Sequence, residues 1–151
     1  MPQPALPHRA RILIEVSKGG FVKRELHQGS SIDYISPLPS PYNYGCIPDV
    51  PGQDGDPLDA VVLGARLKVG QTVDRDIVGV VRFWDAGMPD DKLIASEAPL
   101  TQKQATGLRR FFQIYALARL ALNRRKGLSG RTAFVSVVTR EELDQSWRNS
   151  R

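Results

Sequence analysis

Isoleucine or valine occupies every even-numbered position from 12 to 16, a two-residue period that predicts a β-strand over residues 10–16. A Lys-Gly-Gly turn at 18–20 leads into a second short run over 21–26, and the two strands are predicted to pair as a hairpin. Further β-rich runs lie at 58–63, 72–84, 92–95 and 132–138. The chain is therefore expected to hold about five or six strands.

One long helix is predicted between the last two of these strands. Its main apolar stripe repeats at the spacing of one helix face and consists of Leu108, Phe111, Phe112, Tyr115, Ala118 and Leu122. A second apolar strip lies on the other side of the helix and consists of Ile114, Leu117 and Ala121. This strip indicates either a subunit contact or a helix that is buried more deeply than average. A Thr-Arg-Glu-Glu sequence at 139–142 predicts the cap of a short final helix.

The segment from Gly29 to Asp56 contains five prolines and three further glycines, which exclude a helix. It is predicted to be a long loop, and loops of this length inside compact domains usually carry function. The sequence shows no internal repeat and no domain boundary, so residues 1–151 are predicted to form a single domain.

With 41% hydrophobic and 25% charged residues, the chain has the composition of a globular protein. The single cysteine, Cys46, permits no internal disulfide and offers too few thiolates for a structural zinc or iron-sulfur site, which favours a reducing, cytoplasmic location. Prolines at positions 2, 4 and 7 interrupt any signal-peptide core, and no stretch is long enough to cross a bilayer. We therefore expect a soluble protein with no membrane partner.

A net charge of +5 would by itself suggest an anionic partner, but the charge is unevenly distributed. Residues 101–151 carry eleven Lys or Arg against three acids, whereas residues 41–60 carry four Asp and no Lys or Arg. Four carboxylates this close together repel one another unless they are solvated or share a cation. The acidic segment is therefore the first candidate for chemistry.

The Asp-Gly-Asp-Pro-Leu-Asp sequence at 54–59 places three carboxylates, Asp54, Asp56 and Asp59, within six residues. The tight turn at Gly55 can direct the first two at one site. Oxygen ligands in this arrangement suit Mg²⁺ or Mn²⁺ rather than a soft metal, and their spacing does not match an EF-hand. The alternative is an acidic turn that is merely solvated.

A second acidic turn, at 85–92, contains Asp85, Asp90 and Lys92 between two predicted strands. Two such turns at neighbouring strand ends can converge on one pocket. Carboxylates around divalent ions would neutralise a polyanionic substrate and lower the pKa of a bound water. Lys23, Lys92 and a Tyr hydroxyl would then hold phosphate oxygens, so these residues indicate metal-dependent phosphoryl transfer.

Four segments, taken together and in this order, resemble the soluble family I inorganic pyrophosphatases. They are Lys23-Arg24-Glu25, Pro41-Tyr42-Asn43-Tyr44-Gly45, the six-residue Asp-Gly-Asp-Pro-Leu-Asp sequence at 54–59 and the acidic turn at 85–92. The resemblance covers most of the chain. It implies a mainly β fold in which a five-stranded OB-like barrel is flanked by one long and one short C-terminal helix. It also implies Mg²⁺-dependent hydrolysis of diphosphate and a homo-oligomer, in bacteria usually a hexamer.

The resemblance also assigns roles to single residues. Asp56 would be the general base for the attacking water. The metal ligands would be Asp54, Asp59, Asp85, Asp90 and Glu15. The residues that contact or orient the substrate would be Lys23, Glu25, Tyr44, Lys92 and Tyr115. Taken alone, Glu15 could face solvent, Tyr115 could belong to the core, and Lys23 with Glu25 could be an ordinary surface pair.

Three positions depart from the family pattern, and each departure removes a group expected to hold phosphate. Residues 30–33 lack an Arg, Ser40 stands in place of a Tyr, and Ala116 stands in place of a Lys. The arginines that could supply positive charge instead are Arg24, Arg119 and Arg124.

Two alternatives to an active hydrolase remain, and the departures motivate the first of them. One is a non-catalytic or repurposed relative that binds a phosphate-bearing ligand. The other is a nucleic-acid-binding OB module, suggested by the basic C-terminal third. The scarcity of aromatic residues on the predicted strands and the repulsion between acidic loops and a phosphate backbone disfavour the nucleic-acid alternative.

Overall fold

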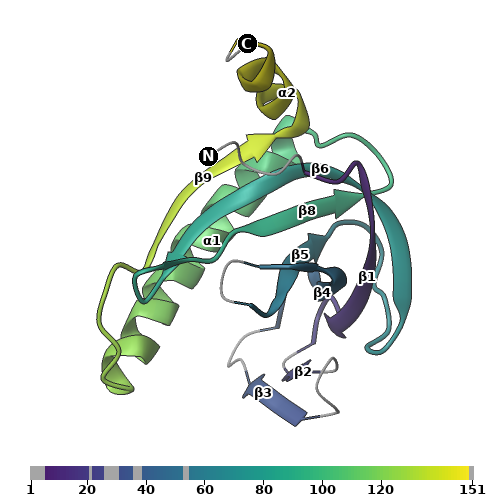
Figure 1. The fold of residues 1–151 in the computed structure, drawn as a ribbon. Helices are drawn as coiled ribbons and strands as arrows, with labels where there is room; N and C mark the ends of the chain where they lie inside the picture. The colour runs from purple at the N-terminus through teal and green to yellow at the C-terminus, as the bar shows by residue number, and fades with distance from the viewer. Residues whose placement is uncertain (1–5, 21, 26–30, 36–38, 53–54, 150–151) are drawn as a thin grey trace.

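The computed structural model describes residues 6–20, 22–25, 31–35, 39–52 and 55–149, with the backbone alone for 22–25, 31–35 and 147. Over these ranges the chain forms nine strands and two helices (Figure 1). The strands are β1 (Arg9–Val16), β2 (Val22–Glu25), β3 (Ser31–Ile35), β4 (Asn43–Pro51), β5 (Pro57–Val62), β6 (Thr72–Asp85), β7 (Met88–Pro89), β8 (Lys92–Ser96) and β9 (Ala133–Thr139). The helices are α1 (Gln102–Arg125) and α2 (Arg140–Asn149).

Five of the strands close into a barrel. β1 pairs antiparallel with β4 and also with β6. The circuit is completed by antiparallel β4–β5, parallel β5–β8 and antiparallel β8–β6 pairs. β7 and β9 also pair with β6, and β2 pairs with β3 in a separate ribbon. The expected mainly β fold, a five-stranded barrel with one long and one short C-terminal helix, is confirmed.

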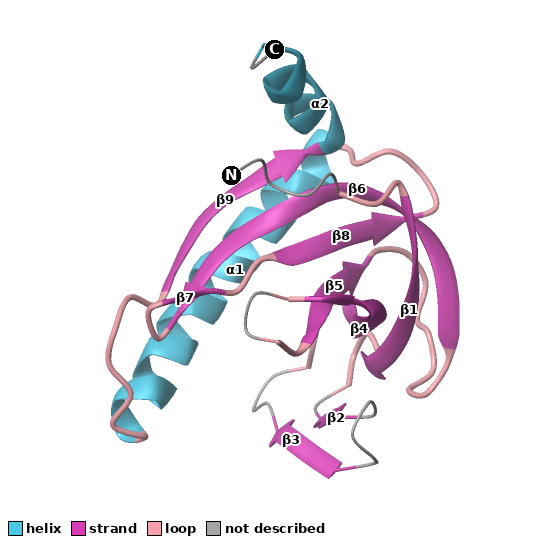
Figure 2. Ribbon diagram, viewed as in Figure 1, coloured by secondary structure: helices cyan, strands magenta, loops and turns pink. Residues whose placement is uncertain are grey.

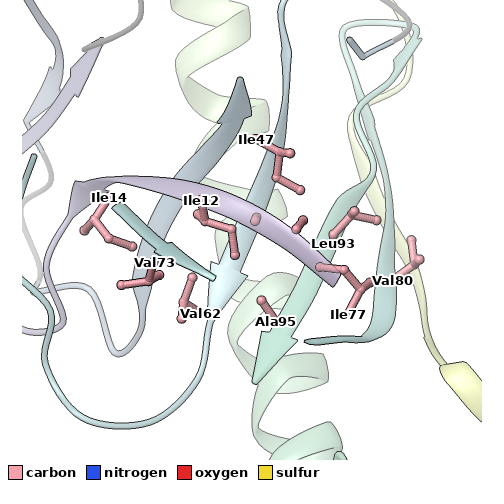
Figure 3. Packing of buried hydrophobic residues seen from close by; sticks show 11 residues of the cluster. Ile12, Ile14, Ile47, Val62, Val73, Ile77, Val80, Leu93 and Ala95 are labelled. Atoms are coloured by element: carbon pink, nitrogen blue, oxygen red, sulfur yellow. The ribbon is translucent and has the colours of Figure 1, made fainter. Parts of the chain in front are cut away.

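Two hydrophobic cores lie on opposite faces of the barrel wall. The core inside the barrel is formed by residues such as Ile12, Ile14, Ile47, Val62 and Leu93 (Figure 3). The second core lies between the outer face of the wall and α1, and it includes Val61, Phe83, Ile94, Leu108 and Phe112. Figure 2 shows α1 passing behind β6, β8 and β9. Because β8 has a core on each face, all five of its residues are buried.

The two helices begin with capping boxes. At the start of α1, the Thr101 hydroxyl accepts a hydrogen bond from the backbone N–H of Gln104 at 3.1 Å, and the Gln104 side chain accepts one from Thr101 N–H at 3.0 Å. Thr139 and Glu142 make the same reciprocal pair at the start of α2, at 3.2 and 3.1 Å. The predicted cap of the final helix is therefore confirmed.

The face of α1 that packs on the barrel differs in part from the predicted stripe. The buried residues of the helix are Ala105, Leu108, Phe112, Ala116 and Asn123. Ala118 is exposed, so its prediction as a sheet-facing residue is wrong. The straight helix continues the line from Leu108 and Phe112 through Ala116, which turns Ala118 away from the wall.

The second apolar strip of α1 faces solvent in the single chain. Ile114 and Leu117 are 65% and 70% exposed, and Ala121 is exposed as well. A helix that is buried more deeply than average is therefore not the explanation of this strip.

Strands β3 and β4 lie in the segment predicted to be a loop, residues 29–56, so that prediction is wrong. The register between β4 and β5 shifts between Ile47 and Pro51, and Pro48 is exposed inside this irregularity. A proline is tolerated where the hydrogen-bond ladder is interrupted. The presence of glycine at position 45 has a different reason. A Cβ at this position would lie 2.1 Å from the carbonyl oxygen of Leu13 on β1. Glycine here allows β1 and β4 to approach each other closely.

The predicted hairpin of the first two strands is also wrong. The turn itself forms, with Gly20 N–H donating to the Ser17 carbonyl at 2.7 Å and Gly19 at a φ of 84°. β1, however, forms its backbone hydrogen bonds with β4 and β6, while β2 pairs with β3. A turn signal fixes a change of direction but does not fix which strands pair across it.

We expect Gly45→Ala to destabilise the barrel by about 3 kcal/mol, because the added methyl group collides with backbone rather than with a movable side chain. Urea unfolding measures the change. Gly107→Ala is the matched control, since its methyl group meets only the Tyr42 hydroxyl at 3.3 Å and should change stability by less than about 1 kcal/mol. Equal effects of the two substitutions would contradict the close approach of β1 and β4.

Candidate active site

The strand register brings three of the predicted site residues onto one face of the barrel wall. Asp59 on β5 is the direct partner of Lys92 on β8, and Tyr44 on β4 is the partner of Val61, two residues after Asp59. Side chains at paired positions, and those two residues apart, project from the same face of a sheet. Since Val61 belongs to the core under α1, Asp59, Lys92 and Tyr44 lie on the outer face of the barrel.

Lys92 is the centre of this group and is 1% exposed. Its Nζ donates to the Asp90 Oδ2 at 2.8 Å and lies 3.6 Å from the Asp59 Oδ2. The Tyr44 hydroxyl donates to the same Asp59 oxygen at 2.9 Å. The aromatic rings of Phe83 and Tyr44 also lie near the ammonium group, with centroids at 5.3 and 6.0 Å. One buried cation therefore connects the acidic turn after β6 to the strand that follows the Asp-Gly-Asp-Pro sequence.

The protonation states follow from burial and from these neighbours. Burial alone would lower the pKa of Lys92, but Asp90 and Asp59 outweigh it and raise that pKa, so the ammonium group stays charged. Burial raises the pKa of Asp90 despite the opposing effect of Lys92. Burial, reinforced by the charge of Asp59, raises the pKa of Tyr44 well above its usual value, which keeps its hydroxyl a donor.

Asp85, the last residue of β6, is held by two side chains of α1. The Arg119 Nε donates to the Asp85 Oδ2 at 3.2 Å, with Nη2 in an ion pair with the same oxygen at 3.1 Å, and the Asn123 Nδ2 donates to Oδ1 at 2.6 Å. Burial would raise the pKa of Asp85, but the hydrogen bonds from Asn123 and Arg119 and the charge of Arg119 lower it. Asp85 is therefore charged and fixed in position at neutral pH.

The turn that follows Asp85 is also held in place. Ala86 has a φ of 49° and Gly87 a φ of 84°, the left-handed pair of a tight two-residue hairpin. A non-glycine residue at this φ is strained, and the turn is supported because Ala86 N–H donates to the Thr132 Oγ1 at 3.0 Å. Thr132 also accepts from the Asn123 Nδ2 at 3.0 Å, so one hydroxyl links the turn to α1.

Tyr115 joins the site from α1. Its ring packs against Phe83 and Phe112, with centroids at 5.5 and 5.7 Å, so part of the side chain belongs to the core as the alternative interpretation proposed. It is also close enough to Lys92 and Arg119 to raise the pKa of each. The core and the site therefore share this residue.

The structure brings together six of the predicted site residues, which are Tyr44, Asp59, Asp85, Asp90, Lys92 and Tyr115. Glu15 lies in β1 at the register shift between Ile14 and Val16, and it is 1% exposed, so the interpretation that it faces solvent is wrong. Asp56 is exposed at the turn before β5. Asp54 and the side chains of Lys23 and Glu25 lie outside the described residues.

Two residues of the site were missed by the sequence analysis, and a third was one of three suggestions. Arg119 was one of three arginines suggested as a source of positive charge, and the structure places it on Asp85. Asn123 and Thr132, both buried, were not predicted. A polar residue such as Asn123, four positions after Arg119 and on the helix face that carries the apolar stripe, is the signal that could have found this group.

The donor chemistry of the site fits a hard divalent cation. Asp59, Asp85 and Asp90 share two cations, Lys92 and Arg119, so the described cluster keeps an excess of negative charge even before Asp56 is counted. Oxygen donors with this excess charge suit Mg²⁺ or Mn²⁺. The types of donor suit such an ion but their placement does not gather them around one, because within the described residues no group of three or more His, Cys, Asp or Glu is arranged to hold a metal ion.

Comparison with known proteins identifies relatives over most of the chain. A family model described as "Inorganic pyrophosphatase" matches residues 12–139. The inorganic pyrophosphatase of Helicobacter pylori is 37% identical over 90 residues, which cover 56% of this chain and 52% of that protein. A soluble inorganic pyrophosphatase of Solanum tuberosum is 32% identical over 130 residues, covering 74% of this chain and 62% of the other. The matched region thus spans little more than half the length of these curated relatives.

Solved structures share the fold over nearly the whole chain. The inorganic pyrophosphatase of Thermus thermophilus superposes with a TM-score of 0.73 and 25% identity, covering 93% of this chain and 88% of that one. The Helicobacter pylori enzyme superposes with a TM-score of 0.70 and 23% identity, covering 97% and 98%.

We expect Lys92→Met to destabilise the protein by about 3 kcal/mol, because it leaves Asp59 and Asp90 partly buried without their cation. Urea unfolding at neutral pH in the presence of a chelator measures the change. Lys103→Met, at an exposed position of α1, is the control and should shift stability by less than about 0.5 kcal/mol. An unchanged midpoint in Lys92→Met would show that the ammonium group does not hold the two carboxylates.

We expect Asp85→Asn to cost about 1–2 kcal/mol of stability at neutral pH and much less in acid. The folded-state pKa of Asp85 is depressed, so its stabilisation is complete above the unfolded pKa and is lost as the pH falls through the lower folded value. The difference between wild type and variant should therefore shrink below about pH 3.9. A pH series of urea unfolding curves, with exposed Asp49→Asn as the control, tests this; a difference independent of pH would contradict it.

Proposed function

The chain belongs to the inorganic pyrophosphatase family, and we propose that it hydrolyses inorganic diphosphate to two phosphates. The observation that carries this proposal is the buried Lys92, held between Asp59 and Asp90 directly beside the Asp-Gly-Asp-Pro-Leu-Asp segment. A cation fixed among carboxylates on the outer barrel wall gives a site in which negative charges of enzyme and substrate can be balanced. The family match supports the substrate class.

We propose that the site binds a divalent cation as its cofactor and that this cation is Mg²⁺. The residues that would hold it are Asp54, Asp59, Asp85, Asp90 and Glu15. When bound, such an ion neutralises phosphate charge and lowers the pKa of a coordinated water. The oxygen donors and the excess negative charge of Asp59, Asp85 and Asp90 support this part of the proposal.

In this proposal one side chain accepts a proton and the others contact the phosphates. Water attacks one phosphorus atom, the bond to the bridging oxygen breaks, and Asp56 accepts the proton that the water loses. Asp56 is exposed, so it is open to solvent water. Lys23 and Lys92 would balance charge on the leaving phosphate. The Tyr44 and Tyr115 hydroxyls would orient it, with Glu25 beside the substrate.

Two of the three departures from the family pattern have a local explanation. The Ser40 hydroxyl donates to the Tyr42 carbonyl at 2.6 Å and so shapes its own loop. Ala116 is buried against the wall, where a small side chain fits. The third departure, at residues 30–33, lies where the structure describes no side chain.

We also propose that the protein is a cytoplasmic homo-oligomer. The exposed Ile114 and Leu117 on α1 support a contact with a second copy. The single, buried Cys46 fits a reducing compartment. Neither helix in the described part of the chain combines the length and the hydropathy needed to span a bilayer.

A phosphate-release assay with diphosphate as substrate tests the function. We expect turnover that depends on added Mg²⁺, and we expect Asp56→Asn to lower kcat by about a hundredfold or more, because it removes the proton acceptor. Asp49→Asn, which removes an exposed carboxylate of β4, is the matched control and should leave kcat unchanged.

Two results would contradict the proposal. Equal phosphate release by wild type and Asp56→Asn would show that Asp56 is not the proton acceptor of the reaction. Calorimetric binding of diphosphate with no release of phosphate would show a phosphate-binding relative without hydrolase activity.

A further inference from the structure

Arg119 is fixed by contacts on one edge of its guanidinium group. Its Nε donates to the Asp85 Oδ2 at 3.2 Å, and its Nη2 lies 3.1 Å from the same oxygen. A guanidinium group has five N–H donors, so this contact leaves Nη1 and part of Nη2 available. Within the described residues Arg119 makes no other hydrogen bond, and 31% of its side chain is exposed. The group is thus both oriented and able to bind an anion.

The anchor of Arg119 is itself held by buried polar groups. Asp85 receives a 2.6 Å hydrogen bond from Asn123, which is 2% exposed. Asn123 also bonds Thr132, whose hydroxyl accepts from Ala86 N–H in the strained turn after β6. Asn123 and Thr132 are buried, and burying polar groups costs free energy unless their hydrogen bonds are satisfied, so this network is more than an ordinary surface ion pair. It determines where the guanidinium lies.

Arg119 and Lys92 differ in how many of their N–H donors remain available for a ligand. Lys92 is 1% exposed, and its ammonium group is already engaged by Asp59 and Asp90. Arg119 lies one helical turn after Tyr115. Burial would lower its pKa, but Tyr115, Asp85 and Asp90 outweigh burial and raise that pKa. It therefore stands at the same cluster with donors still available.

We infer that Arg119 is a substrate-binding residue of this site, whose free guanidinium edge contacts a phosphate group of diphosphate, and that Asp85 and Asn123 are its positioning residues. The inference rests on the proposed function, because it takes the acidic cluster to be the diphosphate site. The planar fork of an arginine matches two phosphate oxygens at once, which a lysine cannot do. A guanidinium already fixed by Asp85 loses little side-chain entropy when the substrate binds.

Calorimetry with methylenediphosphonate and saturating Mg²⁺ tests this inference without needing turnover, because the P–C–P bridge is not hydrolysed. We expect Arg119→Met to weaken binding of this probe about tenfold, and Arg119→Lys to weaken it less. Asn123→Ala should weaken it in the same direction by loosening Asp85. Arg125→Met, which removes an exposed arginine from the last turn of the same helix, should leave the affinity unchanged. The KM for diphosphate should rise in parallel with the probe Kd, with a smaller change in kcat.

The outcomes separate this inference from the proposed function. Unchanged probe affinity in folded Arg119→Met overturns it, and a lower melting temperature with unchanged affinity would show that Arg119 only balances the charge of Asp85. If Arg119→Met does not fold, Arg119→Lys and Asn123→Ala give the result by the same criterion. A wild-type chain that binds the probe through Arg119 but releases no phosphate would refute the proposed hydrolysis alone. A wild-type chain that does not bind the probe overturns the inference.

Discussion

The ammonium group of Lys92 lies in the interior of the protein, where an unbalanced charge is very costly. It is tolerated because Asp90 and Asp59 approach it from two elements and because two aromatic rings flank it. The same contacts reverse the usual effect of burial and keep Lys92 protonated. The packing of β8 under α1 and the acidic cluster beside it therefore depend on each other, since neither the ammonium group nor the carboxylates could be buried without the other.

A second ion pair gives the other half of the cluster a different character. Asp85 is bonded on both oxygens by side chains of α1, and its pKa is lowered, whereas burial raises the pKa of Asp90. Two carboxylates in one cluster thus differ in their affinity for protons. Pairs whose pKa values are driven apart by their surroundings are typical of sites in which one group exchanges a proton or a ligand while another stays charged.

The sequence predicted the elements whose patterning is local, together with the residue types of the site. The alternation around Ile12, the stripe through Leu108 and Phe112 and the cap at Thr139 each depend on neighbours within a few residues. Strand β4 was missed because its prolines and Gly45 are explained by a bulge and by the approach of β1, both of which are long-range features. The network of Asn123 and Thr132 was missed for the same reason, since side chains from α1 and from the segment before β9 meet only in the folded chain.

The parallel pairing of β5 with β8 has a consequence for how the protein is made. In chain order β6 lies between these two strands, so Asp59 can meet Lys92 only after fourteen residues of β6 have crossed the barrel and β8 has returned beside β5. Pairings of this kind close late, because the loop entropy is lost before any contact compensates for it. A nascent chain on the ribosome would thus expose its acidic turn to solvent cations for as long as β8 remains in the exit tunnel. The cluster around Lys92 would be assembled only when the barrel closes.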